Sequence, residues 1–142
     1  MTDREKSLVA AACAVRARSH SPYSRFRVGA ALLTAGGKVH LGTNVENASF
    51  GLSICAERTA VVRAVTDGDT AFVAIAVCTD GPEPTPPCGA CRQVLMEFAP
   101  DAVVLMAGER GNDGPVLRMT VAELLPLAFV DFRPAAGPEA RP

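Results

Sequence analysis

The chain carries almost no excess of charge of either sign. Fourteen lysine and arginine residues meet fifteen aspartate and glutamate residues, which leaves a net charge of −1. Proteins that bind nucleic acids or acidic membranes usually present a basic surface. The balance of charges therefore predicts that neither nucleic acid nor a membrane surface is a partner.

Long apolar runs are missing as well. No run of apolar residues reaches the roughly 20 residues that a helix needs to cross a bilayer. The N-terminus, MTDREKSLVAAACAV, begins with charges of both signs, whereas a secretory signal has a positive start and a stronger apolar stretch. These features predict a cytoplasmic protein.

Histidine is scarce, whereas cysteine is not. The two histidines, His20 and His40, have no partner at the spacing of metal ligands, so we expect ordinary surface or hydrogen-bonded side chains. Disulfides are rare in the cytoplasm, so five cysteines point away from a disulfide framework. They predict metal binding, catalysis or buried thiols instead.

The length and the apolar pattern predict one domain. A chain of 142 residues, 49% of them apolar, can form a single packed core. Apolar periodicity, capping residues and turn residues predict the regular elements. Helices are expected over about 3–19, 56–65, 89–99 and 121–129, and strands over 27–35, 38–44, 72–79, 102–107 and 115–119.

Helices that alternate with apolar strands imply a sheet between helix layers. We therefore predict the α/β class, with a three-layer α/β/α arrangement around a five-stranded mixed sheet. Gly36-Gly37 joins the first two strands in a tight hairpin turn. The connection 109–114 is too short for a crossover helix, so the last two strands should pair antiparallel. We expect a single domain over 1–132 and a loose, Pro- and Gly-rich tail over 133–142.

Three cysteines stand where two predicted helices begin. Cys55 precedes the helix at 56–65, and Cys88 and Cys91 open the helix at 89–99 in a CxxC pattern. The free N–H groups and the positive dipole end of a helix N-terminus favour thiolates. Three thiolates brought together by two helices predict a zinc site with three protein ligands. Such a site keeps its fourth position for water, as catalytic zinc sites do.

Two charged residues close to Cys55 indicate the chemistry of this site. Zinc lowers the pKa of its bound water from about 16 towards 7. Glu57, a carboxylate near the metal in a closed pocket, is suited to shuttle protons. Three thiolates on Zn²⁺ leave a net charge of about −1. Arg58 could donate hydrogen bonds to the sulfurs and tune the metal without touching it.

The cysteines also allow other interpretations. The CxxC could be a redox pair, or Cys13 or Cys78 could close the zinc site as a fourth, structural ligand. A non-catalytic zinc module that binds a partner would have such a closed site and would not need Glu57. We expect Cys13, on the apolar side of a helix, and Cys78, in a buried strand, to be separate core thiols.

The motifs also match a known family. Cys-Ala-Glu followed by Pro-Cys-Gly-Ala-Cys fits the zinc deaminase pattern. The chain resembles the small homotetrameric cytidine deaminases over about residues 5–130, and SPYSRFRVGAAL, GTNVENASFG, CAERTA and PPCGACRQVL carry the resemblance. It implies a cytidine deaminase-like fold, one Zn²⁺ per subunit and a homotetramer whose sites are shared between subunits.

The resemblance implies a reaction as well. Such enzymes hydrolyse cytidine and 2′-deoxycytidine to uridine and 2′-deoxyuridine, with release of ammonia, in pyrimidine salvage. Zinc-bound hydroxide attacks C4 of the base. Glu57 would move the proton to N3 and then to the leaving amine.

The substrate contacts of the family map onto five positions of this sequence. Phe26 should pack against the base, and the backbone carbonyl of Ala56 should contact the base edge. Asn44 and Glu46 should hydrogen-bond the ribose 3′-hydroxyl. Phe129 should reach the base in the site of a neighbouring subunit.

Two related kinds of deaminase remain as alternatives. A deaminase for blasticidin S shares the metal motif, but the intact FRVGAAL and NVEN favour ordinary pyrimidine nucleosides. Deaminases that edit tRNA or DNA need a basic track for phosphates. They usually have His as first ligand and a crossover helix before the last strand, whereas this chain has Cys55 and a short turn. Phe50 stands where many relatives carry Tyr, so the hydroxyl of that Tyr is lost.

Overall fold

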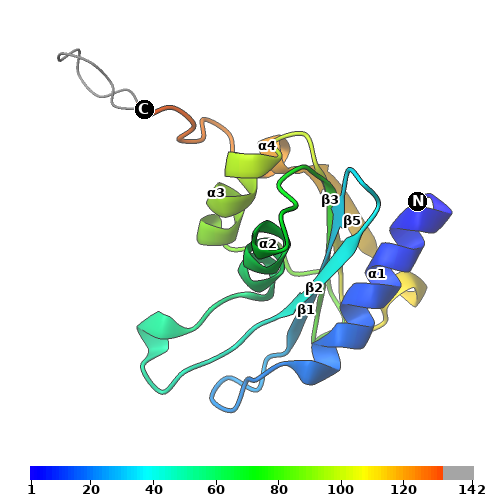
Figure 1. Ribbon diagram of the computed structural model, residues 1–142. Helices are drawn as coiled ribbons and strands as arrows, with labels where there is room; N and C mark the ends of the chain where they lie inside the picture. Colours follow the sequence, from blue (N-terminus) through cyan, green and yellow to red (C-terminus); the bar gives the residue numbers. More distant parts are fainter. Residues whose placement is uncertain (133–142) are drawn as a thin grey trace.

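The structure, a computed structural model, describes residues 1–132 (Figure 1). The tail expected over 133–142 lies outside the described residues. The elements are α1 (Asp3–Val15), β1 (Val28–Thr34), β2 (Val39–Thr43), α2 (Ala56–Thr66), β3 (Phe72–Thr79), α3 (Gly89–Phe98), β4 (Val103–Ala107), β5 (Val116–Thr120) and α4 (Val121–Leu124). Single 3₁₀ turns lie at Arg16–Arg18, Phe50–Leu52 and Gly111–Asp113.

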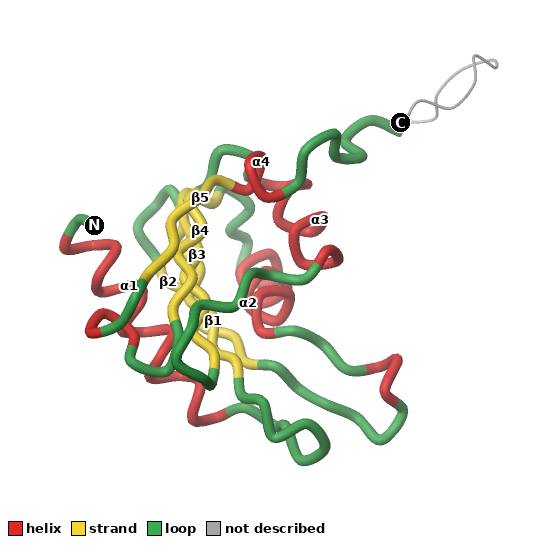
Figure 2. Tube along the Cα trace, turned by 180° about the vertical axis from the view of Figure 1, so that it is seen from behind, coloured by secondary structure: helices red, strands yellow, loops and turns green. Residues whose placement is uncertain are grey.

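The five strands form one mixed sheet in the order β2-β1-β3-β4-β5. β1 pairs antiparallel with β2 and β3, β4 pairs antiparallel with β5, and β3 and β4 run parallel. α1 covers one face of the sheet, and α2, α3 and α4 cover the other (Figures 1 and 2). The predicted three-layer arrangement, the five-stranded mixed sheet and the antiparallel last pair are confirmed.

The central strands are apolar on both sides because helices cover both faces. On β3, Ile75 and Val77 belong to the core beneath α2 and α3, whereas Ala74, Ala76 and Cys78 belong to the core beneath α1. This alternation is the two-residue period of a strand. It explains why β3 and β4 read as uninterrupted apolar runs in the sequence.

Two glycines allow helices to lie directly on the sheet. A Cβ at Gly42 of β2 would overlap the carbonyl oxygen of Ala56, at the start of α2. A Cβ at Gly29 of β1 would overlap the carbonyl oxygen of Ala12 in α1. Only glycine permits such a close approach of backbone to backbone. Gly42 thereby fixes how close the first turn of α2, which carries Glu57, lies to the sheet.

The fold joins two cysteines that we expected to be separate thiols. Cys13 of α1 and Cys78 of β3 form a disulfide, with their Cα atoms 5.1 Å apart. They meet because α1 packs across β1 and β3, which brings together residues 65 positions apart in the sequence. The prediction of two separate core thiols is therefore wrong. Cys55, Cys88 and Cys91 remain free thiols.

The last helix is shorter than predicted. It begins with a capping box, in which Thr120 and Glu123 exchange side-chain to backbone hydrogen bonds, and it ends at Leu124. Pro126 has no N–H to continue the helix and disfavours the helical conformation of the residue before it. Phe129, expected inside the helix, therefore lies in irregular backbone beyond it.

Two further boundaries differ from the expected ones. The β1–β2 connection spans residues 35–38 rather than two residues, and Gly37 in it has a φ of 88°. That left-handed conformation suits glycine. The first helix was expected to run to Ser19, but α1 ends at Val15. A 3₁₀ turn over Arg16–Arg18 follows it directly.

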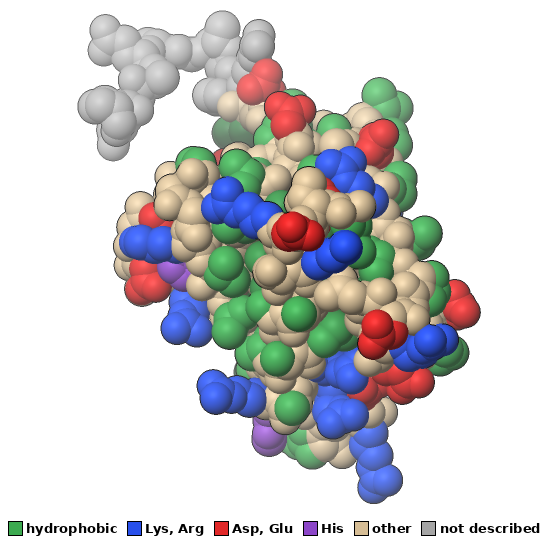
Figure 3. Space-filling view, turned by 90° about the vertical axis from the view of Figure 1, so that its right-hand side faces the viewer, with side chains coloured by type: hydrophobic (Ala, Val, Ile, Leu, Met, Phe, Trp, Pro, Cys, Tyr) green, Lys and Arg blue, Asp and Glu red, His purple; other side chains and the backbone are tan. Residues whose placement is uncertain are grey.

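The surface agrees with the balanced composition. On most of the face that carries α1, basic and acidic side chains are interspersed with apolar ones, and several basic side chains gather towards its lower end (Figure 3). Among the helices of residues 1–132, none has both the length and the apolar character needed to cross a membrane.

Candidate active site

Two helices present their N-termini to the same point. Cys55 is the N-cap of α2 and Cys88 is the N-cap of α3, and both have extended backbone, with φ/ψ of −74°/155° and −65°/164°. Neither side chain makes a capping hydrogen bond, so both sulfurs are available to another partner. Cys91 lies in the first turn of α3 and is fully buried.

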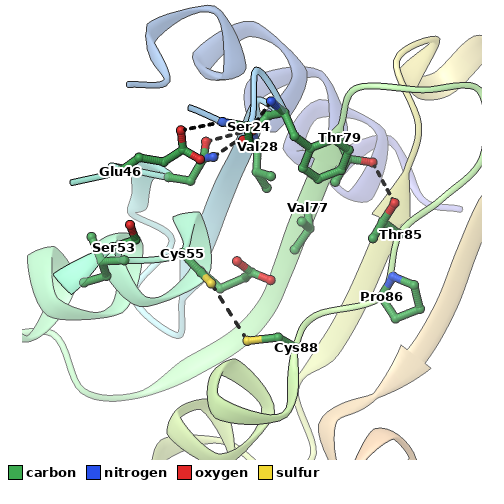
Figure 4. Close-up of a pocket in the computed structure, with 14 residues that line it drawn as sticks. Ser24, Val28, Glu46, Ser53, Cys55, Val77, Thr79, Thr85, Pro86 and Cys88 are labelled. Carbon is green, nitrogen blue, oxygen red and sulfur yellow. Dashed lines mark hydrogen bonds between the residues drawn. The ribbon is translucent and has the colours of Figure 1, made fainter. Parts of the chain in front are cut away.

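The three sulfurs are close enough to share one metal ion. All of them lie within 4.8 Å of one another, and the sulfurs of Cys55 and Cys88 are 3.8 Å apart (Figure 4). Tetrahedral zinc with Zn–S bonds of about 2.3 Å places two sulfurs about 3.8 Å apart. Within residues 1–132, no other group of three His, Cys, Asp or Glu side chains is arranged in this way. The donor set therefore fits Zn²⁺.

A closed four-cysteine site does not form in this fold. Cys13 and Cys78 are bonded to each other, and Cys78 packs in the core beneath α1, on the other side of the sheet from α2 and α3. Three protein ligands leave the fourth position of a tetrahedral zinc ion open to water or substrate. This arrangement is typical of catalytic rather than structural zinc.

Hydrogen bonds divide the charge unevenly between the sulfurs. The hydrogen bond with Cys91, together with those from Arg58 and Cys88, lowers the pKa of Cys55 to about 5. The same contact with Cys55, together with burial, raises the pKa of Cys91. A thiolate is thus favoured at Cys55 at neutral pH, and metal binding displaces the proton from Cys91.

Arg58 provides a positive charge beside the sulfurs. Its Nη2 lies 3.5 Å from the sulfur of Cys55, and hydrogen bonds to Cys55 and Cys91 raise the pKa of the guanidinium group. Its Nε is buried and meets no acceptor among the described residues. Three thiolates on zinc carry about one excess negative charge, which this guanidinium group can offset.

Glu57 is a buried carboxyl group next to the metal site. Glu57 is only 5% exposed, yet it lines the cavity in front of the cysteines. Burial raises its pKa, and the nearby charge of Cys55 acts in the same direction. A carboxyl group with a raised pKa can take up and return protons near neutral pH.

A cavity of about 320 Å³ opens in front of the cysteines. Cys55 and Cys88 lie at one end of it, Glu46 and Ser24 lie at the other, and Val77 lies between them (Figure 4). The volume is typical of a site for one small molecule. The cavity therefore connects the metal site with a polar region that can bind the rest of a substrate.

Asn44 lines this cavity, and most of its amide group is already in use. Its Nδ2 donates to the carbonyl of Phe26 at 2.8 Å. Its Oδ1 accepts the N–H of Val28 at 2.9 Å and the hydroxyl of Ser19. An amide nitrogen has two hydrogens, so Asn44 keeps one donor for a ligand. Phe26, also predicted as a substrate contact, lines the cavity beside it.

Glu46 lines the cavity and also orders the chain next to it. Its Oε1 accepts the backbone N–H groups of Tyr23, at 3.0 Å, and Ser24, at 3.1 Å. Hydrogen bonds from the Ser24 side chain and from these N–H groups hold the pKa of Glu46 below its usual value. The carboxylate is therefore charged at neutral pH, and its second oxygen can accept a hydrogen bond from a ligand.

Two predicted substrate contacts do not line the cavity of their own chain. The carbonyl of Ala56 accepts the hydroxyl of Thr59 at 2.8 Å. At the first position of a helix, the N–H is the group that has no helical partner, so the N–H of Ala56 is better suited than its carbonyl to contact a base. Phe129 is 67% exposed and lines a separate hollow, with Met96 and Val130.

Two residues that hold the surrounding segments were not predicted from the sequence. Arg92 donates from Nε to the carbonyl of Pro87 and from Nη1 to the carbonyl of Leu124, both at 2.7 Å. It thereby ties the segment before the CxxC to the end of α4. Gln93 donates to the carbonyl of Phe129 at 2.7 Å. Both residues directly follow the CxxC, but no sequence pattern indicates which carbonyls they reach.

Comparison with known proteins identifies the family. The family model for the cytidine and deoxycytidylate deaminase zinc-binding region matches residues 2–107. A cytidine deaminase from Halalkalibacterium halodurans is 49% identical over 122 residues, which cover 86% of this chain and 91% of that protein. The crystal structure of a cytidine deaminase from Burkholderia pseudomallei has a TM-score of 0.82 and 46% identity, and covers 91% of this chain and 100% of that chain. The chain belongs to the cytidine deaminase family.

Membership of the cytidine deaminase family confirms the enzyme class, a hydrolase, and the cofactor, one Zn²⁺ per subunit at the cysteine cluster. A blasticidin-S deaminase from Bacillus cereus is also similar, at 30% identity over 115 residues, which cover 75% of this chain and 79% of that protein. Relatives of this chain are therefore named for different substrates.

Replacing Arg58 with alanine tests its role at the metal. Because the guanidinium group offsets the thiolates without binding the ion, Arg58→Ala should keep about one zinc per chain and lose roughly ten- to a hundredfold in kcat. Metal content is measured by mass spectrometry and kcat by ultraviolet absorbance of the nucleoside. Arg63→Ala, on the exposed side of the same helix, is the control and should change neither. An unchanged kcat, or loss of the zinc, would contradict this role of Arg58.

Proposed function

We propose that the chain hydrolytically deaminates cytidine and 2′-deoxycytidine to uridine and 2′-deoxyuridine, with release of ammonia, as a step of pyrimidine salvage. One observation carries this proposal. A three-sulfur zinc site and a buried carboxyl group, Glu57, lie together at one end of a cavity sized for a nucleoside. The similar proteins from H. halodurans and B. pseudomallei, both named cytidine deaminase, support the choice of substrate.

Glu57 carries the proton transfers of this reaction. When bound, zinc lowers the pKa of a water molecule to about 7 and so supplies the nucleophile for C4 of the base. Glu57 accepts the proton that this water gives up and passes it to N3. It then takes the proton of the hydroxyl group added to C4 and passes it to the amino group, which leaves C4 as ammonia. Once Glu57 has taken up the proton of the water, burial favours its neutral form, which can donate a hydrogen bond to N3.

The charges around the cavity favour an uncharged nucleoside over a nucleotide. Glu46 and the thiolates carry negative charge, and no Lys, Arg or His is among the described residues that line the cavity. A phosphate group placed there would lose its hydration and meet negative charges. The same reasoning disfavours a strand of tRNA or DNA as substrate.

The polar end of the cavity suits a ribose 3′-hydroxyl. That group accepts the remaining N–H of Asn44 and donates to Glu46, while Phe26 packs against the base. We assign the base-edge contact to the backbone N–H of Ala56. Ribose and deoxyribose both carry a 3′-hydroxyl, so these contacts support turnover of both nucleosides. An analogue without it would leave buried polar groups unpaired.

We also propose a cytoplasmic location, with residues 1–132 acting as one catalytic domain. Cys55, Cys88 and Cys91 must stay reduced to bind zinc. The cytoplasm keeps exposed thiols such as Cys88 in that state, whereas the Cys13–Cys78 disulfide lies in the core beneath α1.

Glu57→Gln tests the assignment of the proton carrier. The amide keeps the shape of the side chain but cannot transfer protons, so the variant should keep zinc and lose about a hundred- to ten-thousandfold in kcat on cytidine. Glu109→Gln, an exposed carboxyl group outside the cavity, is the control and should behave as the wild type. Blasticidin S is assayed in parallel. Turnover of blasticidin S without turnover of cytidine, or a fully active Glu57→Gln variant, would refute the proposal.

We infer that four copies associate and that each site is completed by a neighbour. Large apolar side chains are exposed in two regions, at Phe50 and Leu52 and at Leu127, Phe129 and Phe132. Exposed apolar patches of this kind commonly mark protein interfaces. Phe129 lies outside the cavity of its own chain, so its contact with a base requires a second subunit.

Subunit mixing tests the shared site. Light scattering should give a mass about four times the 14.8 kDa of the chain. Phe129→Ala and Glu57→Gln should each impair turnover. Unfolded together and refolded as a mixture, the two variants should recover activity, because some sites then combine an intact Glu57 with a neighbour's intact Phe129. Each variant refolded alone is the control. A monomeric wild type, or a mixture no more active than its parts, would refute sharing.

A further inference from the structure

The segment that places Phe26 in the cavity has no regular secondary structure. It connects the 3₁₀ turn after α1 with β1, and both Ser24 and Phe26 line the cavity from it. Arg25 within it has a φ of 56°, a left-handed conformation that is unfavourable for residues with a Cβ. Such a backbone persists only where its surroundings hold it.

One carboxylate holds the C-terminal side of this segment. Asp80 accepts the backbone N–H and the Nε of Arg27 at its Oδ2, both at 3.0 Å. Its Oδ1 accepts Nη2 of the same arginine at 3.1 Å. The N–H of Asp80 in turn donates to the carbonyl of Arg27 at 3.1 Å. Two-pronged arginine–carboxylate contacts are among the strongest and most directional hydrogen bonds in proteins.

Asp80 is itself anchored to the sheet. It directly follows Thr79, the last residue of β3, whose side chain lines the cavity. Arg16 lies with its Nε 3.5 Å from Oδ1 of Asp80 and donates from Nη1 to the carbonyl of Thr79 at 2.7 Å. The carboxylate therefore connects three parts of the chain: the end of α1, the end of β3 and the residue that follows Phe26.

We propose that Asp80 is a positioning residue for the nucleoside base. By fixing Arg27 against the end of β3, it sets the place of Phe26 in the cavity, while Asn44 holds the carbonyl of Phe26 from the other side. The role rests on the proposed function, in which Phe26 packs against the base. Asp80 touches neither the zinc ligands nor Glu57, so its loss should affect substrate binding more than the chemical step.

The first test compares two arginine–carboxylate ion pairs in the zinc-loaded full chain, one near Phe26 and one away from the cavity. Arg27→Gln and Asp80→Ala remove the contact near Phe26. Arg118→Gln is the control, because it removes an exposed contact of the same kind, between Nε and Glu5 at 3.1 Å, away from the cavity. The two test variants should raise the KM for cytidine and lower kcat/KM about tenfold, with kcat within about twofold of wild type and zinc retained. The control should change neither constant.

The second test is a double-mutant cycle with Phe26→Leu. If Asp80 acts through Phe26, then Asp80→Ala or Arg27→Gln should have little further effect on kcat/KM in the Phe26→Leu background. If Asp80 had only a structural role, its substitution would lower the melting temperature. The double variant would then show the product of the two single-variant losses in kcat/KM. A double variant whose loss in kcat/KM equals the product of the two single losses would overturn the positioning role. So would an unchanged KM in both test variants, or a Phe26→Leu variant with unaltered KM. Absence of cytidine turnover by the zinc-loaded wild type would instead overturn the proposed function.

Discussion

The site depends on one geometric constraint, the meeting of two helix N-termini that each begin with a cysteine. Cys55 and Cys88 cap α2 and α3 with nearly the same backbone conformation, and their sulfurs approach to the spacing that tetrahedral zinc requires. The sheet imposes this meeting. Gly42 lets α2 lie directly on β2, and α3 is the crossover between the parallel strands β3 and β4, so it begins beyond the carboxyl end of β3. Ligand sites of α/β folds commonly form at such an edge.

The thiolates and Glu57 repel one another when they are brought together, and a neighbouring arginine offsets this repulsion. Three thiolates exceed the charge of Zn²⁺, and Glu57 adds a further titratable group in a buried position. Arg58 follows on the same helix, with its guanidinium group against Cys55. A cysteine at the helix start, a carboxyl group in the first turn and an arginine beside it thus supply ligand, proton carrier and counter-charge within four residues. This short stretch links the metal to the proton transfers.

The zinc ligands were predicted from local sequence, and Phe26, Asn44 and Glu46, which line the cavity, from the resemblance to the family. Individual tertiary contacts were not predicted. The CxxC, Cys55 and Glu57 follow from spacing and helix position, and the buried strands follow from apolar runs. The disulfide between Cys13 and Cys78 requires α1 to lie across β3, a packing that neither local pattern reveals. Likewise, the contact between Asp80 and Arg27 spans 53 positions. The helix predicted to reach residue 129 ended early because the effect of an internal proline outweighed its apolar periodicity.

Zinc-edge X-ray absorption spectroscopy of the zinc-loaded wild-type chain tests the central claim most directly. The account predicts one zinc per chain with three sulfur neighbours at about 2.3 Å and one nitrogen or oxygen neighbour at about 2.0 Å. Adding a nucleoside analogue that mimics the hydrated base should replace this nitrogen or oxygen neighbour or change its distance from the zinc. Four sulfur neighbours, or a fully active chain without metal, would contradict the account.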